Sequence, residues 1–263
     1  MTTSVFDQPV TSYASKDLEI GELDTPVAEL AQTMQERRIS AIPIVARDRA
    51  LVGVVSRTDL IHLGVFQAAT RRSAAAMPLP ARLAREVMTE HPRTVPASAT
   101  MRDAAAVMAN HGIHRVFVSH HRRLVGVIAA ADNAAAVRDA KLEREVSTIM
   151  TSPIVSVEAS TPLGRAVELL DRIHVTGIVV TDGHQPIGVL SPLDALACRD
   201  LPRGTPIDTV HDAAIVCLPA TTRLSRAADH VAQLDVQRVV VCKDREAVGI
   251  VTGLDFARHI ACS

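Results

Sequence analysis

Aromatic side chains are nearly missing from this sequence. Its 263 residues include no tryptophan, one tyrosine and four phenylalanines. Proteins that bind single-stranded nucleic acids stack the bases on aromatic rings, so this scarcity disfavours such a function. Hydrophobic residues still make up 48% of the chain, and charged residues make up 22%. We therefore expect an ordinary globular protein whose cores are built from aliphatic side chains.

An excess of charge of one sign is also missing. The formal net charge is −1 and the isoelectric point is near 6.8, so there is no broad basic field and a nucleic-acid partner is disfavoured. Arginines do gather in one segment, residues 65–85, at Arg71, Arg72, Arg82 and Arg85. We expect this segment to be a solvated linker, and contact with a partner or a polyanion is the alternative.

Long apolar runs and paired cysteines are absent as well. No apolar run approaches the roughly 18 residues that a membrane-spanning helix needs, and no secretion signal is visible. The four cysteines have no C-x-x-C spacing, which is typical of reduced thiols. They are Cys198, Cys217, Cys242 and Cys262. These absences predict a cytoplasmic protein with no membrane contact.

The sequence also lacks the common catalytic and metal-binding patterns. It contains no G-x-S-x-G motif, no Walker loop and no Rossmann glycine pattern, so we do not expect an enzyme. Histidines occur in the pairs His111/His114 and His120/His121, but no carboxylate or cysteine accompanies them at ligand spacing. We therefore expect neither a metal site nor a resident cofactor.

The most informative pattern is a short run that occurs four times. In each copy a glycine within an apolar stretch is followed six residues later by an aspartate. The pairs are Gly53/Asp59, Gly126/Asp132, Gly188/Asp194 and Gly249/Asp255. A recurrence of this kind indicates an internal repeat, in which one supersecondary unit is used several times.

Each repeat has the same expected order of elements, a helix, two strands and a second helix. In the first repeat, apolar residues at helical spacing predict a helix over residues 27–34, and strands are expected over 39–45 and 51–55. The second helix opens at Ser56. The strands that correspond to 39–45 are expected at 113–118, 175–180 and 236–241.

The repeats also define the expected domain boundaries. A single unit cannot bury its apolar face alone, so we expect repeat 1 to pair with repeat 2 and repeat 3 with repeat 4. The first 15 residues lack periodicity and are expected to form a loosely held leader. The expected segments are 1–15 (leader), 16–64 (repeat 1), 65–85 (linker), 86–138 (repeat 2), 146–200 (repeat 3) and 206–261 (repeat 4).

These units resemble CBS domains, named after cystathionine β-synthase. The resemblance rests on the Val-Met-Thr sequence at 87–89, the Ile-Pro-Ile-Val sequence at 42–45 and the Gly-x-x-Ser/Thr-x-x-Asp run of repeats 1, 3 and 4. It implies an α/β fold of four tandem CBS repeats, paired into two Bateman modules. In this family the cleft of a module binds an adenosine-containing ligand such as AMP, ADP, ATP or S-adenosylmethionine.

The resemblance also implies which residues contact the ligand. The aspartate of the run holds the ribose hydroxyls, and the hydroxyl residue three positions earlier lies near the phosphate. The candidates are Ser56, Asp59, Asp132, Ser191, Asp194, Thr252 and Asp255. A carboxylate can accept two bonds from vicinal hydroxyls, and a helix N-terminus attracts an anion. The alternative is a capping box that only stabilises the helix. Repeat 2 has Ala129 in place of the hydroxyl residue.

A second candidate feature lies at the start of the first strand. Repeat 2 has His114 and Arg115 there, and repeat 4 has Arg238. This resembles the gamma subunits of AMP-activated protein kinases, in which a His-Arg pair at this position reaches the nucleotide phosphates. A guanidinium can bind phosphate through two hydrogen bonds. The alternative is a surface arginine whose stem covers apolar surface.

The resemblance therefore predicts a regulatory protein that senses an adenosine nucleotide. We expect a homodimer or an internal disc of two modules, and an effector protein whose identity is unknown. The alternative is an interaction scaffold with vestigial clefts. Ala129 favours that alternative, and the aspartates retained in all four repeats oppose it.

Overall fold

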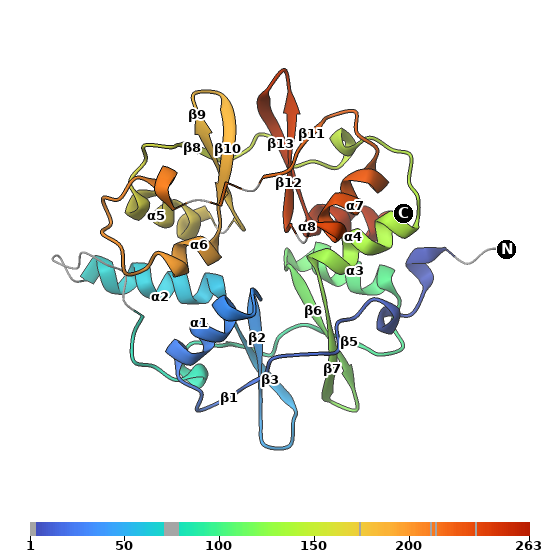
Figure 1. The fold of residues 1–263 in the computed structure, drawn as a ribbon. Coiled ribbons are helices and arrows are strands. Elements are labelled where there is room, and N and C mark those ends of the chain that lie inside the picture. Colours follow the sequence, from blue (N-terminus) through green and yellow to red (C-terminus); the bar gives the residue numbers. More distant parts are fainter. Residues whose placement is uncertain (1–3, 71–78, 174, 211, 214, 235) are drawn as a thin grey trace. The chain divides into compact units, whose positions relative to one another are not determined.

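The chain folds into two compact units, each built from separated parts of the sequence. The structure, a computed structural model, describes residues 4–70, 79–173, 175–210, 212–213, 215–234 and 236–263 (Figure 1). Unit 1 comprises Met1–Leu18, Arg93–Ile154 and Val216–Ser263, and unit 2 comprises Glu19–Pro92 and Val155–Ile215. Repeats 2 and 4 thus share unit 1, and repeats 1 and 3 share unit 2. Arg71 and Arg72 of the expected linker lie outside the described residues.

Unit 2 contains two small sheets with their helices. Its elements in repeat 1 are β1 (Gly21–Glu22), α1 (Val27–Glu36), β2 (Ala41–Val45), β3 (Leu51–Ser56), α2 (Arg57–Thr70), η3 (Ala84–Glu86) and β4 (Thr89–Glu90). Those of repeat 3 are β8 (Ser156–Glu158), α5 (Leu163–Ile173), β9 (Ile178–Asp182), β10 (Gln185–Leu190), α6 (Pro192–Ala197) and η5 (Ile207–Thr209). The strand orders are β1-β2-β3-β4 and β10-β9-β8.

Unit 1 repeats this arrangement. Its first part has η1 (Val5–Asp7), η2 (Val10–Ser12), β5 (Thr94–Pro96), α3 (Met101–His111), β6 (Arg115–His120), β7 (Arg123–Ala129), α4 (Ala130–Asp139) and η4 (Val146–Thr148). Its second part has β11 (Cys217–Pro219), α7 (Leu224–Gln233), β12 (Arg238–Lys243), β13 (Glu246–Thr252) and α8 (Gly253–Ala261). The strand orders are β5-β6-β7 and β11-β12-β13. In both sheets a parallel strand is added to an antiparallel hairpin.

Four strands begin two or three residues later than the sequence pattern predicts. The strands expected from residues 39 and 113 begin at Ala41 and Arg115, and those expected from 175 and 236 begin at Ile178 and Arg238. In repeat 2 the cause is the end of α3. Gly112 adopts φ +62°, and the amide of Ile113 donates to the carbonyl of Met108 at 3.0 Å. These two residues therefore close the helix before the strand can start.

The leader is held more firmly than expected. Phe6 and Val10 are buried in the core of unit 1, with 3% and 0% of their surface exposed. The amide of Val10 donates to the carbonyl of Ala99 at 2.8 Å. Ser15 and Val127 exchange two backbone hydrogen bonds of 3.0 Å. The expectation of a loosely held segment is therefore wrong, because two apolar side chains in 3-10 turns anchor it.

The leader contains one of four lead-in segments, which we define as residues 13–15, 87–89, 149–151 and 210 with 212, each at the start of a repeat or just ahead of it. Each lead-in pairs with the second hairpin strand of a different repeat. Ser15 pairs with Val127, Thr89 with Val54, Thr151 with Ile250 and Asp212 with Val189. The lead-in of repeat 1 therefore pairs with a strand of repeat 2, and the lead-in of repeat 2 pairs with a strand of repeat 1. Repeats 3 and 4 exchange their lead-ins in the same way.

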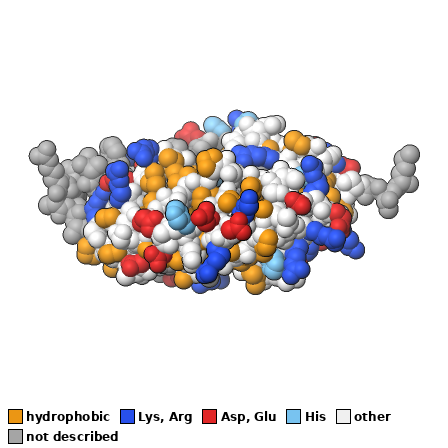
Figure 2. Space-filling view, turned by 90° about the horizontal axis from the view of Figure 1, so that it is seen from above, with side chains coloured by type: hydrophobic (Ala, Val, Ile, Leu, Met, Phe, Trp, Pro, Cys, Tyr) orange, Lys and Arg blue, Asp and Glu red, His pale blue; other side chains and the backbone are white. Residues whose placement is uncertain are grey.

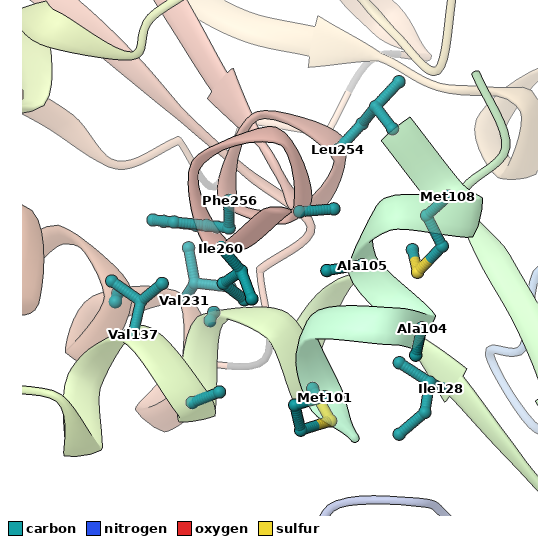
Figure 3. Packing of buried hydrophobic residues seen from close by; sticks show 14 of the residues in the cluster. Met101, Ala104, Ala105, Met108, Ile128, Val137, Val231, Leu254, Phe256 and Ile260 are labelled. Carbon is teal, nitrogen blue, oxygen red and sulfur yellow. The ribbon is translucent and has the colours of Figure 1, made fainter. Parts of the chain in front are cut away.

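The core of unit 1 combines side chains from its helices, its strands and the 3-10 turns of the leader. Figure 3 shows Phe256 and Ile260 of α8 between Val137 of α4 and Ala105 of α3. All four side chains are fully buried. The core is aliphatic apart from a few rings, as the composition predicts. Repeats 2 and 4 thus pack against each other through helices within this unit.

The surface carries a mixture of charges. On the face in Figure 2, acidic and basic side chains are interspersed. Among the residues that the structure describes, no helix is long and apolar enough to cross a bilayer.

Candidate functional site

Each of the four repeated aspartates lies in the first turn of a helix and accepts a bond from the residue three positions earlier. In repeat 1, the amide and the hydroxyl of Ser56 donate to Oδ2 of Asp59 at 2.7 and 2.6 Å. Ser191 and Asp194 repeat these bonds at 2.7 and 2.6 Å. The capping-box geometry is therefore present. For Asp59 it leaves Oδ1 without a hydrogen-bond partner among the described residues, so capping and ligand binding are compatible.

Asp132 has the weakest cap of the four. Only the amide of Ala129 donates to it, at 2.7 Å, because alanine has no hydroxyl. Burial raises the pKa of Asp132 to about 6, and the bond from Ala129 opposes this shift only in part. The half-buried carboxylate of repeat 2 is therefore easier to protonate than a solvent-exposed aspartate.

Asp255 differs from the others because both of its oxygens are engaged. Oδ2 accepts from the amide and the hydroxyl of Thr252, both at 2.8 Å. Oδ1 accepts from the hydroxyl of Thr151 at 2.9 Å and from Nη1 of Arg258 at 3.1 Å. The residue is 2% exposed. Its carboxylate is thus already satisfied by the protein.

Sequence reasoning missed Thr151 and Arg258. Thr151 stands in the lead-in segment of repeat 3 and reaches Asp255 across 104 positions, so no local pattern predicts the contact. Arg258 lies three residues after Asp255 on α8, a spacing at which side chains on one helix face meet. That spacing is the one feature of the sequence that could have pointed to Arg258.

Strand register places two predicted arginines beside helix starts. Arg115 pairs with Ala129, the residue that precedes α4, and Arg238 pairs with Thr252, which precedes α8. Both pairs belong to unit 1. The corresponding pair in repeat 1 of unit 2 is Ala41 and Ser56, which brings no cation.

The predicted cationic residues meet in unit 1. Burial is the main reason that the pKa of His114 falls to about 4, and the charges of Arg115, Arg238 and Arg258 lower it further, whereas Asp255 raises it. These groups therefore lie within electrostatic reach of one ring. We call His114, Arg115, Arg238, Asp255 and Arg258 the basic cluster. The cluster brings three guanidinium groups and one carboxylate within electrostatic reach of His114, and guanidinium groups bind anions.

A buried amide joins the two helix starts next to this cluster. Asn133, in the first turns of α4, is fully buried, and its Nδ2 lies 3.4 Å from the carbonyl of Gly253 and 3.4 Å from the sulfur of Met108. Its Oδ1 has no hydrogen-bond partner among the described residues. Asn133 therefore ties repeat 2 to repeat 4 at the point where both capped helices begin.

The ten predicted site residues are divided between the two units. Unit 1 holds His114, Arg115, Asp132, Arg238, Thr252 and Asp255, and unit 2 holds Ser56, Asp59, Ser191 and Asp194. In unit 2, the helices α2 and α6 that carry these pairs contact each other. The contacts within each unit join repeats 2 and 4, and repeats 1 and 3. The pairing of repeat 1 with 2 and of repeat 3 with 4 stays a prediction.

Comparison with known proteins identifies the family. The sequence matches the family described as "CBS domain" over residues 10–65, 84–132 and 146–199, which is more than half of the chain. The chain belongs to the CBS domain family, and CBS domains are the only family detected. The match does not extend to repeat 4, but the structure shows four CBS-like units.

Solved structures share this fold over nearly the whole chain. Protein MJ1225 from Methanocaldococcus jannaschii, described as a proposed archaeal homolog of g-AMPK, has a TM-score of 0.84 and 16% identity, covering 97% of this chain and 100% of its own. An uncharacterized conserved protein from Pyrococcus horikoshii has a TM-score of 0.66 and 15% identity, covering 96% and 100%. The comparison with curated proteins found no match. At these identities the likeness shows the fold alone.

Proposed function

We propose that this protein is a regulatory module that binds an adenosine-containing nucleotide and passes the signal to an effector protein. The observation that carries the proposal is the basic cluster, which lies beside two helix starts in unit 1. Membership in the CBS domain family and the fold shared with the proposed g-AMPK homolog support it. The cluster favours the phosphate-bearing ligands AMP, ADP and ATP over S-adenosylmethionine, which has no phosphate.

Two kinds of side chain among the candidate residues suit different parts of such a ligand. A carboxylate oxygen without a protein partner, as on Asp59, can accept a hydrogen bond from a ribose hydroxyl. The guanidinium groups of Arg115 and Arg238 can each bind phosphate through two charge-assisted hydrogen bonds. In this proposal the protein binds and releases the ligand without catalysing a reaction.

The signal arises from a change in populations. A ligand shifts a conformational equilibrium only by as much as its affinities for the two states differ. The residues that hold the ligand come from two repeats, so binding favours one packing of those repeats over another. We propose that a homodimer or an internal disc of two modules carries this change to the effector.

Two observations favour a second function, an interaction scaffold with vestigial clefts. Asp255 is saturated by protein donors, and Ala129 leaves Asp132 without the usual hydroxyl. In this function the capping boxes serve only helix stability, and partner binding does not depend on nucleotide.

A thermal-shift panel with AMP, ADP, ATP, S-adenosylmethionine and cyclic dinucleotides separates the two functions. The protein is first freed of nucleotide, which is checked by chromatography of the denatured sample. A ligand at 100 times its Kd adds about 2.7 kcal/mol, so Tm rises by several degrees.

The variants Asp59→Asn and Asp194→Asn are the matched tests, because asparagine keeps a capping acceptor and loses the charge. A shift with one nucleotide that either variant abolishes supports the sensor. If no ligand shifts Tm, the scaffold is the better description.

A further inference from the structure

We propose that Arg258 binds the phosphate of the ligand, and that Asp255 and Thr151 position Arg258 instead of binding ribose. This inference rests on the proposed function and changes the role assigned to repeat 4. It makes repeat 4 a phosphate-binding part of unit 1, and it leaves the ribose to other aspartates.

The first step is the saturation of Asp255. Its two oxygens accept four hydrogen bonds, from Thr252, Thr151 and Arg258, at 2.8 to 3.1 Å. A ribose diol that bound there would have to displace Thr151 or Arg258 from a carboxylate that is 2% exposed. At Asp59 no such displacement is needed, because the described residues leave Oδ1 open.

The second step is the geometry of Arg258. Its side chain is 53% exposed, whereas the Asp255 side chain is 3% exposed, so the arginine extends from a buried anchor toward solvent. Among the described residues, its guanidinium hydrogen-bonds only to Asp255, through Nη1. A guanidinium has five N–H donors, so most of them remain available to an anion.

The third step is the position of Arg258 relative to the other arginines. Arg238 lies opposite Thr252 in the strand register, and Thr252 and Arg258 both donate hydrogen bonds to Asp255. Asn133 brings the start of α4 to the start of α8. Arg115 stands beside the start of α4 through its pairing with Ala129. The charges of Arg115, Arg238 and Arg258, which come from both repeats, all act on the ring of His114.

Thr151 has a specific part in this arrangement. It comes from the lead-in segment of repeat 3, and its backbone pairs with Ile250 at 2.9 and 3.0 Å. The backbone position of Thr151 is therefore fixed by strand pairing. Its hydroxyl donates one hydrogen bond to Oδ1 of Asp255, and Nη1 of Arg258 donates another. Loss of the hydroxyl would remove one of the two hydrogen bonds to Oδ1, so Oδ1 and the guanidinium bonded to it would be held less firmly.

Titration calorimetry on the nucleotide-free full-length chain tests the inference with three probes, ADP, inorganic pyrophosphate and adenosine. We expect Arg258→Met to weaken ADP and pyrophosphate about tenfold and to leave adenosine unchanged, because it removes one charge-assisted contact to phosphate. Arg258→Lys restores part of the affinity. Thr151→Val weakens ADP by a smaller factor. Arg226→Met, which removes an exposed arginine of α7 in the same repeat, changes none of the three.

The outcomes distinguish this inference from the proposed function. If the parent protein binds ADP and Arg258→Met binds it equally well, the inference is wrong and the sensor stands. Asp255→Asn gives a second readout, because a ribose role predicts lost adenosine affinity and a positioning role predicts lost phosphate affinity alone. If the parent binds neither nucleotide nor adenosine, the proposed function fails. In that case, pyrophosphate binding that is lost in Arg258→Met would still support a phosphate-binding role for Arg258. No pyrophosphate binding by the parent protein would overturn that role. Circular dichroism confirms that each variant is folded.

Discussion

The side chain of Met88 occupies the space directly above Gly53. A Cβ atom on Gly53 would come within 2.8 Å of Cγ of Met88 and would overlap its sulfur. Met150 lies over Gly249 in the same way, with its Cγ 2.9 Å from where a Cβ would be. In both places the methionine of a lead-in segment packs against the recurring glycine, in space that a larger residue at the glycine position would fill.

This contact predicts that Gly53→Ala destabilises the protein by about 1 to 3 kcal/mol, because an extra methyl group in a packed site forces the neighbours to shift. Urea denaturation measures the change. Gly204→Ala is the control, since nothing lies within 4 Å of a Cβ at that position. The double variant Gly53→Ala with Met88→Ala should recover part of the loss. Full stability of Gly53→Ala would contradict the described packing.

The raised pKa of Asp132 predicts a pH dependence of stability. Its pKa is about 6 in the folded protein, against an ordinary aspartate value of 3.8, so the folded state binds the proton more tightly than the unfolded state. This contribution is fully present below about pH 4 and is lost as pH rises through 6. It is on the order of 2 kcal/mol. Asp132→Asn should remove this part of the pH dependence.

The same carboxylate can be measured directly. NMR titration of the Asp132 carboxyl carbon should give a midpoint near 6 in the parent protein. Ala129→Ser should lower it, because the added hydroxyl can donate to the ionised carboxylate, as Ser56 does to Asp59. A midpoint near 4 in the parent would refute the burial that we describe.

The anchored leader predicts that Phe6→Ala destabilises unit 1. Phe6 is 3% exposed, and the guanidinium carbon of Arg102 lies 5.9 Å from the centre of its ring. Loss of a buried phenylalanine typically lowers the free energy of unfolding by about 3 kcal/mol or more. Thermal denaturation should show a lower Tm for Phe6→Ala. The control is Gln8→Ala, which changes an exposed side chain and should leave Tm unchanged. Equal Tm values would mean that the leader contributes nothing to the core.

The buried amide of Asn133 predicts an unusual result for Asn133→Leu. Its Oδ1 lacks a partner among the described residues, and its Nδ2 makes only long contacts of 3.4 Å. An apolar side chain of similar size removes the cost of burying that oxygen, so we expect unchanged stability or a gain of about 1 kcal/mol in urea denaturation. A clear loss of stability would indicate that an ordered water satisfies the amide.

The fold could be predicted from the sequence because its signals are local. In the run from Gly53 to Asp59, which occurs four times, the glycine serves strand packing and the aspartate serves helix capping. Both requirements act within a few residues, so the pattern is visible in the sequence. The start of the first hairpin strand of repeat 2 was missed because Gly112 closes α3 in a left-handed conformation that the apolar pattern does not reveal.

The candidate site was predictable only in part. Arg115 and Arg238 are visible as departures from the other repeats, and the structure brings them to one cluster. The bond from Thr151 to Asp255 joins residues 104 positions apart, and the grouping of repeats 2 and 4 depends on contacts through space. No pattern within a single repeat carries that information.

Unit 1 is built from both ends of the sequence, which makes the order of synthesis matter for folding. The core of unit 1 contains both Phe6 and Phe256, so its first residues leave the ribosome long before their partners exist. Contacts of such high sequence separation slow folding, and apolar residues stay exposed while the chain waits. A single cut anywhere between Phe6 and Phe256 would also separate parts of the same core. Unit 1 can therefore reach its native packing only after synthesis has passed Ile260.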